Sequence, residues 1–176
     1  MGDTSITVMA IFLAAILMFI FPLMAMADRS DDISQLSVQT ETTEFVDDVR
    51  TTGKLTAAKY QNYVEKISAT GNTYDVQLKI QRLDENPGKK TSQVEATKIG
   101  ENVYYSEYTT QILNALESGS VLLKEGDIVT ASAKNTNTTM SQELKSFIYK
   151  VTGNDQYSIS AEHSGIVTTN GTSSNT

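Results

Sequence analysis

A run of 22 residues without a charged side chain, Ile6 to Ala27, constrains this chain more than any other feature of its sequence. As an α-helix rising about 1.5 Å per residue, the run is about 33 Å long, close to the ~30 Å hydrocarbon core of a bilayer. Asp3 precedes it, and it is followed closely by Asp28, Arg29, Asp31 and Asp32. Its length and its charged borders predict a helix that crosses a membrane once, with the lipid bilayer as its partner.

Two interpretations of Met1 to Ala27 fit the residues. The first is a retained anchor, because Met1 to Ser5 has no basic residue and the apolar run is longer than a signal-peptide core of about 7 to 15 residues. The second is a cleaved signal peptide, because Ala25 and Ala27 form the small-x-small pattern of a processing site. The simpler topology keeps the short N-terminus (residues 1–5) inside the cell and the rest of the chain outside.

Composition excludes several classes of function. The net charge is −7, from 21 acidic against 14 basic residues, whereas binding to nucleic acid needs clustered Lys and Arg. The chain has no cysteine and a single histidine, which excludes thiol nucleophiles, thiolate metal sites and zinc sites built from several histidines. We therefore expect no metal, no cofactor and no nucleic-acid partner.

The residues also give no support for catalysis. His163 lies on a predicted strand beside Glu162, and alternation places these two side chains on opposite faces, so we expect a half-buried structural histidine. Adjacent acids occur at 31–32, 47–48 and 84–85, and we interpret them as solvated charges. An extracellular enzyme that uses acids alone requires two carboxylates in one cleft, one of them with a raised pKa. We expect a protein that is not an enzyme.

Residues 28–53 are predicted to form a helical stem. Apolar and threonine side chains recur there every three or four residues, at Ile33, Leu36, Thr40, Thr43, Val46 and Val49. Gly53 follows as the expected left-handed residue at the helix end. No Gly or Pro interrupts the stem, so the membrane helix either continues straight into it or breaks near Ser30 to Asp32, giving two helices.

Residues 54–167 are predicted to form one head in which helices and strands follow one another. A helix is expected between its capping residue Thr56 and Gly71. Its apolar face is predicted to consist of Tyr60, Tyr63, Val64 and Ile67. Strict alternation from Tyr74 to Gln81 then predicts a half-buried strand. Residues 84–102 lack periodicity and are predicted to form an exposed loop.

The second half of the head continues the pattern. We expect a helix at 104–117 and a hairpin in which residues 121–123 and 127–133 flank a turn. Thr139 and Gln142 match a capping box at the start of a helix that ends at Gly153. A last strand is expected at 156–163, and the Thr- and Ser-rich tail 168–176 is expected to be disordered. The sum is an α+β protein: an antiparallel sheet packed by helices on a membrane stem.

This layout resembles that of the pilin-like (TadE-like) proteins of tight-adherence (Flp-type) pili and of type II and type IV secretion systems of Gram-positive bacteria. The segments that carry the resemblance are Met1 to Asp28, Phe45 to Thr56 and Asn72 to Leu78. It implies a structural subunit of the cell surface that assembles with itself or with other pilus or secretion-system subunits through its apolar helix.

The resemblance also suggests roles for particular residues. The small residues Ala10, Ala14 and Ala15 would allow close packing between helices. Gly2 is the one leader glycine at which a pilin would be processed, and Thr7 stands where pilins carry glutamate. These residues suit an accessory or minor pseudopilin rather than a major pilin. The alternative function is a secreted or anchored surface-binding module that recognises a ligand through the loop 84–102, with Met1 to Ala27 as a signal peptide.

Overall fold

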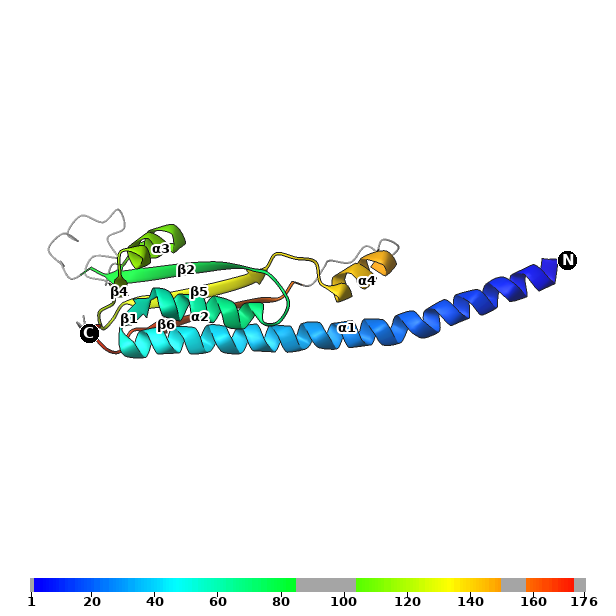
Figure 1. The fold of residues 1–176 in the computed structure, drawn as a ribbon, viewed down its shortest axis with the longest axis horizontal. Helices are drawn as coiled ribbons and strands as arrows, with labels where there is room; N and C mark the ends of the chain where they lie inside the picture. The colour runs from blue at the N-terminus through cyan, green and yellow to red at the C-terminus, as the bar shows by residue number, and fades with distance from the viewer. Residues whose placement is uncertain (1, 85–103, 150–157, 173–176) are drawn as a thin grey trace, which may run out of the picture.

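In a computed structural model, one very long helix runs along the side of a small α+β head (Figure 1). The structure describes residues 2–84, 104–149 and 158–172. Helix α1 (Gly2–Thr52) is 51 residues long and continues without a break from the apolar run through the stem, with Pro22 inside it. Of the two alternatives for the stem, the single continuous helix is therefore confirmed.

Within the residues that the structure describes, the head contains a four-stranded antiparallel sheet, a two-stranded sheet and three short helices. After α1 the elements are β1 (Lys54–Thr56), α2 (Ala57–Ser68), β2 (Tyr74–Leu83), β3 (Tyr104–Tyr108), α3 (Thr109–Glu117), β4 (Ser120–Leu122), β5 (Ile128–Asn135), α4 (Met140–Tyr149) and β6 (Ser160–Ile166). The strand order of the larger sheet is β3-β2-β5-β6, and β1 pairs with β4. The predicted α+β class is confirmed.

The head half of α1 packs against β5 and β6 through one face. This face is buried at Ser34, Val38, Thr42, Phe45, Val46 and Val49. The predicted stripe is therefore right at its end but wrong at its start, because Ile33, Leu36 and Thr40 are exposed. Positions three and four residues apart define a helix face, and two such faces are compatible with this threonine-rich sequence.

A polar contact inside the core explains why a threonine takes an inward position. The Thr42 hydroxyl donates to the Val38 carbonyl at 2.6 Å and lies 2.9 Å from the hydroxyl oxygen of Tyr63 on α2. The rings of Phe45 and Tyr63 stack beside it, with centroids 4.5 Å apart. Because the buried hydroxyls have partners, burying them costs little, and α2 is fixed against α1. The predicted cap of α2 is confirmed, since the Thr56 side chain accepts from the Lys59 amide at 3.2 Å.

Strand β3 occupies the first residues of the predicted helix 104–117, so that prediction is wrong for Tyr104 to Tyr108. These residues pair antiparallel with the end of β2. Pairing with a longer strand overrides their local preference. The helix begins only at Thr109, whose hydroxyl lies 2.9 Å from the Leu78 amide nitrogen and 3.2 Å from the Leu78 carbonyl oxygen.

The predicted hairpin of residues 121–123 and 127–133 is also wrong. Strand β4 pairs with β1, whereas β5 lies between β2 and β6. The carboxylate of the buried Asp127 accepts from the main-chain amides of Leu83 at 3.0 Å and Lys124 at 2.9 Å. These contacts anchor the turn to the end of β2, so the two segments join different sheets.

Gly53 ends α1 in the left-handed region as predicted, with φ +62°. The tail closes over this glycine, so the expectation of disorder is wrong for residues 168–171. The Thr168 amide donates to the Arg50 carbonyl at 3.0 Å, and the Gly171 amide donates at 2.8 Å to the carbonyl just after β4. A Cβ on Gly53 would lie 2.1 Å from a carbonyl oxygen of the tail. Glycine at this position therefore serves both the turn and the close approach.

The capping box that opens α4 is confirmed. The Gln142 amide donates to the Thr139 hydroxyl at 3.2 Å, and the Thr139 amide donates to the Gln142 side-chain oxygen at 3.1 Å. The predicted end of this helix at Gly153 lies outside the described residues, as do the first two residues of the predicted strand 156–163. The rest of that strand lies beside β5, with Ile159 and Ala161 buried.

Candidate functional site

The described part of the head leaves most of the apolar half of α1 uncovered. Every residue from Thr4 to Met26 is exposed except Ile20 and Met24, which are half-buried. An 18-residue window of this helix has a mean hydropathy of 2.7, and none of its residues is buried. The helix is long and apolar enough to be a membrane span or a signal sequence. In water this surface would be a large unpaired apolar patch, which marks a contact with lipid or protein.

The three predicted helix-packing alanines all lie in this exposed segment. Ala10 and Ala14 are four residues apart and share one face of α1. Ala15 follows Ala14 directly and therefore lies about 100° further round the helix axis. The structure thus places the three small residues on two faces instead of a single stripe.

The predicted processing residues lie within α1 rather than at a loop. Gly2 is the first residue of the helix. Ala25 is exposed on the helix, whereas Ala27 is buried against the head at 5% exposure.

A second exposed apolar feature lies on the stem. Ile33 and Leu36 are 62% and 66% exposed, and they point away from the face of α1 that packs on the sheet. Ile33 continues a series of large exposed side chains that recur every seven residues along α1. That series is Phe12, Phe19, Met26 and Ile33. The uncovered apolar surface therefore extends past the last residue of the apolar run into the level of the head.

The acids that follow the apolar run hold α4 in place. The Thr139 hydroxyl donates to the Asp31 carboxylate at 2.6 Å, and the Ser141 hydroxyl donates to the carboxylate of Asp28. Lys145 Nζ lies 2.5 Å from the same Asp28 carboxylate. The hydrogen bonds from Lys145 and Ser141 lower the pKa of Asp28 below its ordinary value of 3.8. Contacts between segments more than 100 residues apart thus fix α4 beside α1, as Figure 1 shows.

An open groove of about 560 Å³ lies at this junction. Leu23, Met26 and Ala27 of α1 line one side of it, together with Met140 at the start of α4. Ser30 and Asp31 of α1 also line it, and so do polar residues of two loops, among them Asn72, Asn137 and Thr138. We call this the junction groove. It combines apolar side chains of the uncovered helix with amides and hydroxyls of the head.

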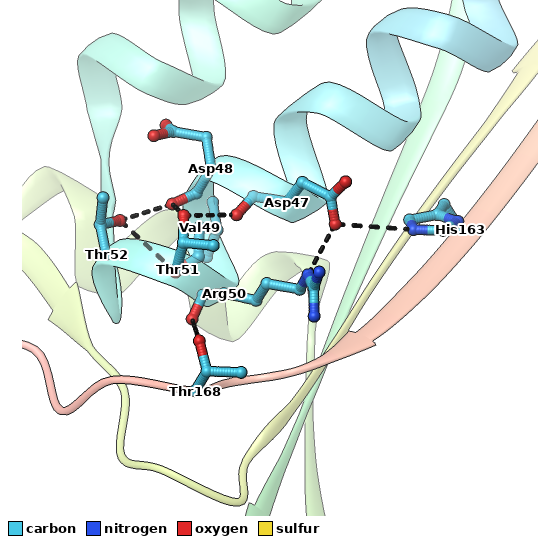
Figure 2. Close-up of polar contacts among 8 residues, drawn as sticks. All are labelled: Asp47, Asp48, Val49, Arg50, Thr51, Thr52, His163 and Thr168. Carbon is cyan, nitrogen blue, oxygen red and sulfur yellow. Dashed lines mark hydrogen bonds and ion pairs between the residues drawn. The ribbon is translucent and has the colours of Figure 1, made fainter.

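His163 belongs to a different, structural cluster. Figure 2 shows Asp47 between Arg50 and His163, with Arg50 Nε 2.6 Å and His163 Nε2 4.0 Å from the same carboxylate oxygen. The predicted half-buried histidine is confirmed, since its side chain is 37% exposed. The cluster connects α1 with β6.

The side chains of the adjacent acids bond different partners in the folded structure. Asp48 pairs with Lys59 at 2.8 Å, while Asp47 pairs with Arg50. Asp31 bonds α4, and of the pair 84–85 the structure describes only Asp84. Across residues 2–84, 104–149 and 158–172, no three His, Asp or Glu side chains are grouped so as to hold a metal ion.

A long N-terminal apolar helix packed against an antiparallel sheet is a pilin-like architecture, and this chain has it. Comparison with known proteins finds no matching family model, no matching curated protein and no matching solved structure. The likeness is therefore one of architecture.

Sequence reasoning missed the bonds from Asp28 and Asp31 to α4, although both partners carried a signal. The acids bordered the apolar run, and Thr139 began a capping box. No periodicity connects segments so far apart in the chain, so only the folded structure brings them together.

Proposed function

We propose that this protein is a non-enzymatic, pilin-like subunit, of the minor pseudopilin type, of a bacterial pilus or secretion apparatus. A single pass of α1 holds it in the cell membrane with the head outside the cell. It assembles with copies of itself, or with other subunits of the apparatus, through the apolar half of that helix. The observation that carries the proposal is the uncovered apolar half of α1, joined without a break to a folded head.

The packing of Ala27 supports retention of the helix. A signal peptide ends where the chain can be cut, and exposed, irregular segments are the usual sites of cleavage. Here the backbone is helical on both sides of Ala27, and the side chain of Ala27 is buried against the head. Asp28, which would begin a cleaved chain, is bonded to α4.

Two faces of the apolar half suit contact with another helix. One carries Ala10 and Ala14, whose small side chains permit close approach of backbones. The other carries Phe12 and Phe19, which begin the seven-residue series that continues to Ile33. A seven-residue repeat is the seam along which parallel helices supercoil, and a membrane orients all copies of the chain in parallel.

Disulfide cross-linking tests this proposal cleanly because the chain has no cysteine. We would express A14C, F19C and S118C variants in the native cell, oxidise the membranes mildly and measure dimers by non-reducing electrophoresis. We expect a cross-linked dimer for A14C or F19C, depending on which face is used. The S118C variant, at the end of α3, controls for random collision and should remain monomeric.

The mass and N-terminal sequence of the native protein decide between the two functions. A membrane-bound chain that retains the residues before Ala27 agrees with the pilin-like subunit. A soluble, monomeric chain that begins at Asp28, with no dimer for A14C or F19C, contradicts it. The surface-binding module would then lead, although its proposed loop lies almost wholly outside the described residues.

A further inference from the structure

The junction groove changes character along the direction of α1. Along α1 its lining passes from Leu23 and Met26, which belong to the apolar run, to the polar Ser30 and Asp31. From the head it is lined by Met140 of α4 and by polar residues of two loops, among them Asn72, Asn137 and Thr138. A surface that is apolar on one side and rich in hydrogen-bonding groups on the other matches the boundary between lipid chains and head groups.

Met140 is the residue that brings the head into this boundary. It is 65% exposed although it opens a helix of the folded head. It lines the same groove as Met26, which is 70% exposed and is the next to last residue of the apolar run. If lipid surrounds Met26, the Met140 side chain lies at the same boundary. Methionine is unbranched and flexible, so it adapts readily to an irregular apolar surface.

The contacts of Asp28 and Asp31 fix the position of Met140 along the axis of α1. Thr139 and Ser141, on either side of Met140, bond these two carboxylates. Two hydrogen bonds flanking one residue hold it at a defined level of the helix. Lys145 also pairs with Asp28, which reduces the cost of bringing this carboxylate close to an apolar medium.

We propose that the α4 end of the head is a membrane-contact surface, seated on the lipid bilayer that α1 crosses. Met140 lies among the upper lipid chains beside Leu23 and Met26, and Asn72 and Asn137 face the lipid head groups. The inference rests on the proposed membrane anchoring. It adds that the head rests on the membrane instead of standing clear of it.

A lipid surface fits this position better than a soluble partner does. The apolar wall of the groove is a continuation of the helix face that the bilayer would already cover. A soluble protein approaching Leu23 and Met26 would have to displace lipid first. A second copy of the chain can reach the groove within the membrane, so the test below separates that occupant from lipid.

The experiment uses the full chain in vesicles of phosphatidylcholine and phosphatidylglycerol. An environment-sensitive fluorophore is attached to single cysteines in the variants M140C, F12C and S118C. Quenching is measured with iodide in water and with nitroxides carried on lipid head groups or upper chains. We expect M140C to be shielded from iodide and quenched by the shallow lipid nitroxides. F12C should behave as a deep lipid site, and S118C should be quenched only by iodide.

The outcomes distinguish this inference from the proposed function. If F12C lies in lipid but M140C is quenched by iodide as strongly as S118C, the head stands off the membrane and the inference is overturned alone. If F12C is also open to iodide, the membrane anchoring fails, and the inference fails with it. If M140C is shielded from both quenchers and its cysteine cross-links to a second copy, the groove is a subunit interface and the lipid proposal is wrong.

A matched pair of variants tests the role of the acids. In the M140C background, D28A combined with D31A removes the bonds to α4, and iodide quenching should rise toward the S118C level. The same double replacement in the F12C background should leave F12C quenching unchanged. D32A removes an exposed acid next to Asp31 and should leave M140C shielded. Equal iodide quenching of M140C in the D28A/D31A variant and in the D32A variant would contradict the claim that Asp28 and Asp31 set the position of Met140.

Discussion

The two halves of α1 belong to one helix and have opposite surroundings. Residues 4–26 are apolar on every side and are almost entirely exposed. Residues 27–49 are mostly polar, yet they bury one face against the sheet, with Val38, Val46 and Val49 fully covered. A helix that is apolar all round has no preferred side and suits a medium that surrounds it, whereas an apolar stripe selects one protein partner. The two halves therefore differ both in how much of their surface is apolar and in whether that apolar surface is confined to one side.

The comparison also explains why the head half tolerates threonine and serine in its buried face. Ser34 and Thr42 are small, and the Thr42 hydroxyl has two partners in the core. In lipid such hydroxyls would need partners within their own helix or a neighbouring one. The apolar half accordingly has only one threonine after Ile6, at Thr7.

The largest expected effect comes from placing a charge on the buried face of the head half. V46D puts a carboxylate at a fully buried position facing the sheet. We expect a loss of about 3–5 kcal/mol in the free energy of unfolding, or no folded head, because an unpaired buried charge is not compensated. Urea unfolding in detergent, followed by circular dichroism, measures it. The control Q39D, exposed on the same helix, should change stability by less than about 0.5 kcal/mol; an equal effect would contradict the assigned faces.

The end of α1 offers a second test. G53A forces an L-residue into φ +62° and places its Cβ against the C-terminal tail, so we expect a loss of at least about 2 kcal/mol. G71A is a matched control, because Gly71 also has positive φ, at +84°, but its added Cβ would meet nothing within 4 Å. It should cost only about 1 kcal/mol. Thermal unfolding compares the two variants, and similar losses would show that the tail does not press on Gly53.

A smaller effect is expected at the boundary between the halves. Because the folded-state pKa of Asp28 is lowered, its bond to α4 stabilises the fold above the ordinary value of 3.8 and is lost as pH falls through the lowered pKa. The Asp28 side chain is 38% exposed, so solvent screening limits the ion pair with Lys145 to less than about 1 kcal/mol.

Hydrogen exchange of the α4 amides measures this contribution. D28N should lower the protection of α4 at about pH 6 and remove most of the pH dependence of that protection below about pH 4. Residues of β2 and β5, which do not contact Asp28, should keep their protection and serve as an internal reference. An unchanged pH dependence in D28N would mean that another group links α4 to α1.

The smallest effect on stability is expected on the outer face of the stem. Replacing Ile33 and Leu36 together by serine should change the free energy of unfolding of the head by less than about 0.5 kcal/mol, since both side chains are exposed. In the F19C background the same replacement should reduce dimer cross-linking if the seven-residue series is the contact. Full cross-linking after replacement would restrict the contact to the apolar half.

The features that sequence could predict are local. The apolar run, the cap at Thr56, the alternating strand from Tyr74 and the capping box at Thr139 each depend on a few neighbouring residues, and each has its counterpart in the structure. Gly53 at the end of α1 was predictable for the same reason, because one helix end requires one left-handed residue.

The features that sequence missed depend on distant partners. Tyr104 to Tyr108 became a strand because the end of β2 was open to pairing, and residues 121–123 joined β1 instead of β5. The stem stripe was misplaced because Ile33 and Leu36 share the three-and-four spacing of the buried residues without sharing their face. The junction groove combines the middle of α1 with residues 70–72 and 137–139, which lie far from it in the sequence.

The absence of a break in α1 has a mechanical consequence. Figure 1 shows the head half of α1 lying lengthwise beside β5 and β6, so tension on the N-terminal half reaches the sheet as shear along the strands. In shear, the contacts of the buried Val38, Val46 and Val49 resist together instead of opening one after another. The polar bonds of Asp28 and Asp31 lie at the near end of this contact and would take the load first. In the proposed membrane-anchored subunit, the continuous helix would transmit force from the membrane directly to the head.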